Sequence, residues 1–163
     1  MARRARPSLA TTAASAGANA RVGAEMMEAA QQVVAARLDI LSAGLNDPLK
    51  ADLPEIALMG AEKVEALTLA TAAATRGLSD VGQRFARDAS REAQAATSAL
   101  TAMVQAGSPA AAYAVQMNYA LGWWGRATGS ILSLNAGLAA AQAQAMAPLH
   151  RTATANARRL ARR

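Results

Sequence analysis

The stretch Leu53–Phe85, LPEIALMGAEKVEALTLATAAATRGLSDVGQRF, decides the fold class of this 163-residue chain. Its apolar residues alternate at spacings of four and three, which is the pattern of an amphipathic helix with a coiled-coil-like seam. Gly77 is a point at which this helix could be interrupted. The candidate oligomer seam comprises Leu53, Val64, Leu67, Leu78, Val81 and Phe85.

The same helical pattern extends beyond this stretch in both directions. Asp52 is a suitable cap for the helix, with Glu55 three residues later completing a capping box. A continuous helix from Leu53 to Met103 would be about 75 Å long, whereas a compact domain of this length is about 40 Å across. The chain must therefore be elongated, broken at Gly77 or oligomeric.

Two further helices are predicted on either side of this one. The first runs from about Asn19 to Leu45, where one apolar stripe recurs every three or four residues. The last begins with Ser108 as its cap and Pro109 in its first turn, and it ends near Ala147. We therefore expect an all-α fold, an elongated bundle of long, amphipathic, alanine-rich helices in residues 21–147, which assembles into a homo-oligomer.

The last of these helices carries large side chains most of the way round. Trp123 and Trp124 are adjacent, so they point about 100° apart and cannot both enter one narrow seam. Contact with another helix or subunit, and contact with an apolar surface, both explain such a pair. The candidate apolar contact residues are Tyr113, Met117, Leu121, Trp123, Trp124, Ile131 and Leu138.

The two ends of the chain are basic, although the body is not. The first 21 and last 16 residues contain nine arginines and no acid, whereas the remaining residues have a net charge of −3. We expect residues 1–20 to be a disordered basic tail and residues 148–163 a short basic helix. Such ends could contact nucleic acid weakly through phosphates or simply remain solvated.

Targeting and membrane signals are weak. A secretory signal does not fit because an apolar core is missing near the N-terminus, and an arginine-rich transit peptide is a minor alternative. No sufficiently long uncharged apolar run predicts a transmembrane helix. The absence of cysteine suits a reducing cytoplasm.

Enzyme chemistry is not indicated. His150 is the one histidine, and it has no acid or nucleophile near it in the sequence. The chain lacks Glu-x-x-His pairs, phosphate-binding loops and dinucleotide fingerprints. We therefore expect no catalytic residue, no metal and no cofactor. The 47 alanines stand against 39 larger apolar residues, so the helices are strongly favoured but thinly packed.

Two segments resemble the phasins, helical proteins that coat polyhydroxyalkanoate storage granules. They are MMEAAQQVVAARLDILSAGLNDPLKADLPEIALMGAEKVEAL at Met26–Leu67 and APLHRTATANARRL at Ala147–Leu160. The resemblance covers about a third of the chain. It implies a non-enzymatic, oligomerising protein at the granule surface in the cytoplasm, and it has no active-site residue to transfer.

Composition and resemblance agree on one hypothesis. Amphipathic helices of low hydrophobicity are typical of interfacial proteins. We therefore expect a coat protein that covers granules and limits their coalescence. The alternatives are a nucleic-acid-associated protein that uses its arginine-rich ends and a purely structural helical oligomer.

Overall fold

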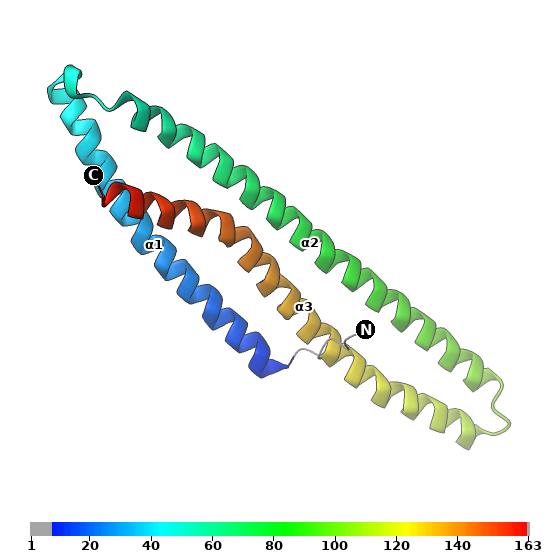
Figure 1. Cartoon of the computed structure of the whole chain (residues 1–163). Helices are drawn as coiled ribbons and strands as arrows, with labels where there is room; N and C mark the ends of the chain where they lie inside the picture. Colours follow the sequence, from blue (N-terminus) through cyan, green and yellow to red (C-terminus); the bar gives the residue numbers. More distant parts are fainter. Residues whose placement is uncertain (1–7, 163) are drawn as a thin grey trace, which may run out of the picture. The chain divides into compact units, whose positions relative to one another are not determined.

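Three long helices form this protein. The computed structural model describes residues 8–162, apart from the side chain of Lys50. In chain order these residues form α1 (Leu9–Asn46), the short 3-10 helix η1 (Pro48–Lys50), α2 (Leu53–Val104) and α3 (Pro109–Leu160), as Figure 1 shows. The part of the chain that the structure describes contains no strand, which confirms the all-α prediction.

The predicted helix caps at Asp52 and Ser108 are both confirmed. Asp52 Oδ1 accepts a hydrogen bond of 3.1 Å from the backbone N–H of Glu55. Ser108 Oγ accepts one of 3.2 Å from Ala111 N–H, and Pro109 is the first helical residue. Such side chains satisfy N–H groups that the first helical turn leaves without a partner.

The first helix begins earlier than predicted. It starts at Leu9 rather than near Asn19, so the expected disordered tail is wrong for residues 9–20. Ser8 and Thr11 bond reciprocally: Ser8 N–H donates to Thr11 Oγ1 at 2.8 Å, and Thr11 N–H donates to Ser8 Oγ at 3.2 Å. This cap and the alanines that follow favour the helix more than Gly17 weakens it. Residues 1–7 of the predicted tail lie outside the described residues.

The last helix also runs further than predicted. Pro148 lies inside α3 and is buried, so residues 148–160 are not a separate helix. Proline in a helix interior costs about 3 kcal/mol. The residues beyond it offset this cost because Asn156, Ala157 and Leu160 are all buried.

The described chain divides into two compact units. Unit 1 contains residues 8–13 and Leu78–Leu138, and unit 2 contains Ala14–Gly77 and Ala139–Arg163, of which residue 163 is not described. In unit 2, α1 and α3 share a small cluster of Ala29, Val33, Ala157 and Leu160. Unit 1 consists mainly of the second half of α2 and the first part of α3.

Small residues set the spacing of the helices. Gly77 is buried in unit 2, where an added Cβ would lie 2.6 Å from the Cβ of Ala141. In unit 1, a Cβ on Gly137 would lie 3.0 Å from a methyl group of Val81. The alternative that α2 breaks at Gly77 is therefore wrong, since the helix uses this glycine for close approach to α3 and continues through it.

Candidate apolar interaction surface

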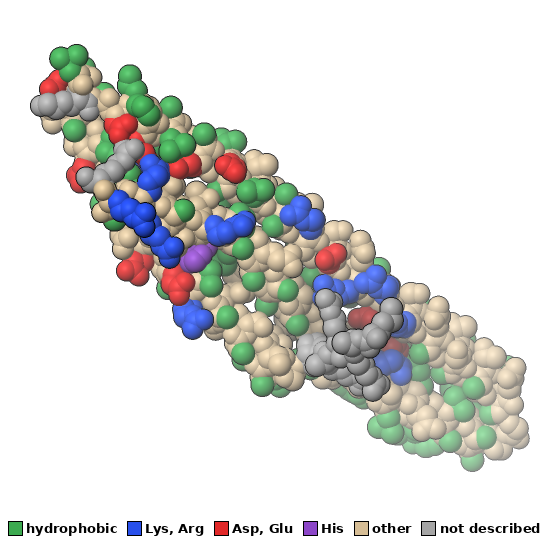
Figure 2. Space-filling view, viewed as in Figure 1, with side chains coloured by type: hydrophobic (Ala, Val, Ile, Leu, Met, Phe, Trp, Pro, Cys, Tyr) green, Lys and Arg blue, Asp and Glu red, His purple; other side chains and the backbone are tan. Residues whose placement is uncertain are grey.

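Alanines occupy the interior of this protein, whereas its larger apolar residues lie outside. Six of the eight buried hydrophobic residues are alanine, and 25 large hydrophobic side chains among the described residues are exposed. Figure 2 shows hydrophobic side chains spread over the visible face, interspersed with charged groups. Apolar atoms are common on protein surfaces, but large apolar side chains in rows indicate a contact surface.

One such row follows α3 in unit 1. It is formed by six of the predicted contact residues, which recur at spacings of three, four and seven and therefore share one helix face. Their exposed fractions range from 40% to 67%. The six residues are Tyr113, Met117, Leu121, Trp124, Ile131 and Leu138.

The two tryptophans are both exposed, as their adjacent positions suggested. Trp123 is 40% and Trp124 67% accessible to solvent. Their ring centroids lie 5.1 Å apart with an interplanar angle of 75°, an edge-to-face arrangement. The pair therefore widens the apolar face of α3 and leaves an indole available on each side of it.

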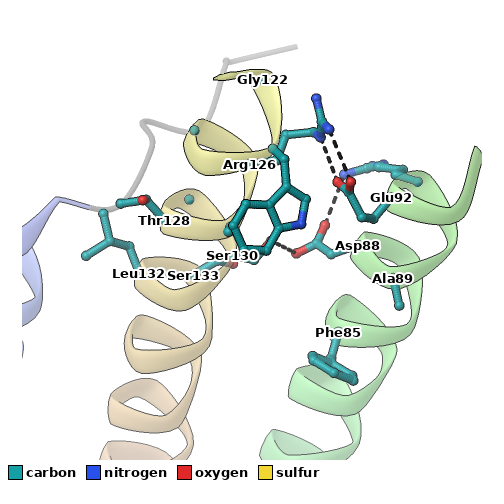
Figure 3. A pocket seen from close by; sticks show the side chains of 15 residues that line it. Phe85, Asp88, Ala89, Glu92, Gly122, Arg126, Thr128, Ser130, Leu132 and Ser133 are labelled. Carbon is teal, nitrogen blue, oxygen red and sulfur yellow. Dashed lines mark hydrogen bonds and ion pairs between the residues drawn. The ribbon is translucent and has the colours of Figure 1, made fainter. Parts of the chain in front are cut away.

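A polar cluster joins the two helices beside the tryptophans. Arg126 of α3 donates to both carboxylate oxygens of Glu92 on α2, at 2.6 and 3.1 Å, as Figure 3 shows. Tyr119 Oη donates to the same carboxylate at 2.8 Å, and the Arg126 guanidinium lies 5.3 Å from the Tyr119 ring centroid. A groove of about 890 Å³ lies alongside and is lined by Trp123, Phe85 and Arg126.

The hydrogen bonds of this cluster shift the protonation of its members. The hydrogen bond from Arg126, followed by that from Tyr119, lowers the pKa of Glu92 below its ordinary value of 4.5. The hydrogen bond to Glu92 raises the pKa of Tyr119. Both effects favour a charged Glu92 and a neutral Tyr119, so the cluster is a stable ion pair rather than an acid–base pair.

Five of the six residues of the predicted α2 seam are exposed rather than packed within the chain. Leu53, Val64 and Leu67 in unit 2, and Leu78 and Phe85 in unit 1, are each at least 58% exposed, whereas Val81 is half-buried. A different stripe of α2 is buried, and it lies about 100° around the helix axis from the predicted seam. This inner face of α2 comprises Glu55, Ala66, Ala70, Ala73 and Gly77.

A buried charge network forms one end of the inner face. Glu55 is 1% exposed, and it accepts hydrogen bonds from two nitrogens of Arg159. Glu62 accepts from Arg37 at 2.5 Å, from Arg159 at 3.1 Å and from Asn156 at 2.7 Å. Two carboxylates thus meet two guanidiniums, and the network connects α1, α2 and α3 within unit 2.

Sequence reasoning missed both polar clusters. Glu55 could be identified only as a capping residue, and Arg159 only as one of several terminal arginines. Glu55 and Arg159 are bonded to each other but lie 104 residues apart in the sequence, so no local spacing reveals the pair. The one available signal was the position of Glu55 and Glu62 seven residues apart, on a helix face with Ala66 and Ala73.

The side chains that could bind a metal are dispersed in the described part of the chain. No group of three His, Cys, Asp or Glu side chains between residues 8 and 162 is placed to hold a metal ion. His150 lies within α3, is half-buried and has Nε2 3.3 Å from a carboxylate oxygen of Glu25. This single contact does not amount to a catalytic constellation.

None of the helices in residues 8–162 combines the length and apolar character needed to cross a bilayer. Comparison with protein-family models, curated proteins and solved structures finds no match.

Proposed function

We propose that this chain is a non-enzymatic coat protein that binds the surface of intracellular polyhydroxyalkanoate granules and limits their coalescence. The observation that carries this proposal is the distribution of apolar side chains, with alanine inside and leucine, isoleucine, methionine and tryptophan outside. A helix whose large apolar residues are exposed gains free energy when it is placed on an apolar surface. Each such side chain gains about 1.5–3 kcal/mol when fully covered.

The polar groups support a surface role rather than insertion. Charged side chains accompany the apolar rows on each helix, and the formal net charge is +6. A helix lying at an interface places one face in the apolar phase and the other in water. Charged outer faces would then keep neighbouring granules apart by repulsion.

The choice of a polyester surface depends on the sequence resemblance to phasins. Both resembling segments, Met26–Leu67 and Ala147–Leu160, fold into unit 2. They contribute the apolar stripe of α1 and all members of the charge network. A cytoplasmic location follows from this proposal.

The arginine-rich ends give less support to a nucleic-acid-binding function. Arg159 donates to Glu55 and Glu62, so its charge is already paired. Arg21 lies 4.0 Å from Glu25. A nucleic-acid complex would use the remaining arginines, and its affinity would fall steeply with added salt.

Co-sedimentation with polyhydroxyalkanoate particles tests the proposal. A Trp124→Lys, Ile131→Lys variant places two charges in the apolar row of α3, so we expect its bound fraction to fall at least tenfold. Asn118→Lys adds a charge to an exposed position outside the row, and it should bind like the unmodified protein. Failure of the unmodified protein to sediment with the particles would contradict the proposal, as would equal binding by all three proteins.

A further inference from the structure

A narrow apolar groove lies within unit 2, between α1, α2 and the last turns of α3. Its volume is about 530 Å³, within the range of small-molecule sites. Its walls include Val34, Leu38 and Leu41 from α1, Leu67 from α2 and Leu149 from α3. Ala153 also lines it and leaves space that a larger side chain would fill.

The dimensions of the groove favour a slender ligand. The lining residues run from Ala30 to Leu41 on α1 and from Met59 to Leu67 on α2, which are lengths of about 16 and 12 Å. The groove is therefore long enough for an extended alkyl chain to contact both α1 and α2 along its length.

The charges around the groove favour a ligand with an anionic end. Arg37 and Glu62 both line it, but they pair with each other at 2.5 Å and leave no net charge. Lys63 is an exposed lining residue that forms no ion pair with any residue the structure describes. The groove thus combines apolar walls with one unpaired ammonium group.

We propose that this groove binds a free acyl carboxylate of about ten to twelve carbons, with its chain along Leu38 and Leu67 and its carboxylate at Lys63. The chain length follows from the groove length of about 12–16 Å and from the advance of about 1.25 Å per bond along an extended chain, in which bonds of about 1.5 Å meet at about 111°. This inference goes beyond surface coating and does not depend on it.

Isothermal titration calorimetry with decanoate tests the inference, with decanol as the uncharged comparison. We expect saturable binding of both ligands, with decanoate the tighter. Lys63→Gln should weaken decanoate binding about two- to fivefold and leave decanol binding unchanged, because only the carboxylate meets the ammonium group. Equal weakening of both ligands, or of neither, would overturn the assigned position of the carboxylate.

A second pair of variants tests the location of the chain. Leu38→Asp places a carboxylate on the groove wall and should weaken both ligands at least tenfold. Leu69→Asp is the matched control, because Leu69 is an exposed leucine of unit 2 that does not line the groove. Identical affinities for the two variants, or no measurable binding by the unmodified protein, would overturn the inference.

Measuring polyester-particle binding alongside decanoate binding distinguishes a failure of the groove assignment from a failure of the proposed coat function. Leu38→Asp lies in unit 2 and leaves the apolar row of α3 in unit 1 intact. A protein that binds polyester particles but not decanoate would overturn the groove assignment alone. The reverse result would overturn the coat proposal and support the groove.

Discussion

Glu55 and Arg159 show how individual side chains position the helices of unit 2. A buried carboxylate loses its hydration, and this cost is offset only when cationic partners supply good hydrogen bonds. Arg159 provides two such bonds, and Arg37 lies 3.7 Å away. Because the partners come from α1, α2 and α3, the network favours one register of the three helices over others.

Removal of one partner should therefore be costly. We expect Arg159→Met to lower the free energy of unfolding by about 2–4 kcal/mol, because Glu55 then stays buried with an incomplete set of partners. Urea denaturation followed by circular dichroism measures this change. Arg158→Met is the control, since Arg158 is exposed, and its effect should remain within about 0.5 kcal/mol. Equal effects of the two substitutions would argue against the network.

Glu92 gives the protein a predictable response to acid. Its pKa is lowered in the folded state, chiefly by the hydrogen bond from Arg126. The stabilisation is therefore fully present above the unfolded value near 4.5, and it is lost as the pH falls through the lower folded pKa.

A comparison with Glu92→Gln isolates this contribution. The melting temperatures of the two proteins should differ most near neutral pH and should converge as the solution is acidified below the folded pKa of Glu92. Carboxyl chemical shifts from NMR would report the titration directly. A Glu92 that titrates at or above 4.5 would contradict the geometry of the cluster.

At the scale of the elements, α2 has two apolar faces with different uses. Its inner face is built from alanine and glycine, which lets α3 approach within van der Waals contact at Gly77 and Ala141. Five of the six residues of the predicted seam are exposed, and Val81 is half-buried. A helix packed on small residues buries little area, so the polar networks contribute specificity that the thin core lacks.

Substitution of two glycines of α2 by alanine tests close packing at Gly77 and intrinsic helix propensity at Gly60. Gly77→Ala should lower the free energy of unfolding by about 1–3 kcal/mol, because the new methyl group overlaps Ala141. Gly60→Ala should raise it by about 0.5–1 kcal/mol, since nothing lies within 4 Å of the added carbon. Thermal and urea unfolding of the two variants measure both signs. A stabilising Gly77→Ala would contradict the close approach.

The helices could be predicted from the sequence, but their pairing could not. Local chemistry is sufficient for the caps at Asp52 and Ser108 and for the long helical periodicity. The start at Leu9 depends on a reciprocal Ser8–Thr11 cap that Gly17 and the polar composition obscured. The passage of α3 through Pro148 depends on the packing of distant segments. The inner face of α2 was missed because the seam was chosen by hydrophobicity, which ranks leucine above alanine. Close approach of two helices instead favours the smaller side chain, so alanine and glycine are the buried residues.

At the scale of the whole molecule, both units leave apolar rows exposed. The seven contact residues proposed on α3 are all exposed in unit 1. The seam of α2 remains a proposed oligomer interface with coiled-coil-like packing. An assembly that buries these rows in solution and opens on a granule would reconcile both proposals.

Sedimentation equilibrium tests the oligomer interface. Val64→Glu with Phe85→Glu introduces charge at two exposed seam positions, so we expect dissociation to a monomer that remains helical. Ala61→Glu alters an exposed residue outside the seam and should leave the assembly unchanged. If the double variant and Ala61→Glu show the same mass distribution, the oligomer interface does not lie at this seam.

The most direct test of the central claim uses Trp123 and Trp124, the only tryptophans in the chain. Both are exposed in the structure of the single chain, so their fluorescence emission reports transfer to an apolar surface. We predict a blue shift and protection from a soluble quencher when polyhydroxyalkanoate particles are added, and no change with polar silica particles. Unchanged emission and full quencher access on polyester would contradict the claim that these apolar faces bind a granule surface.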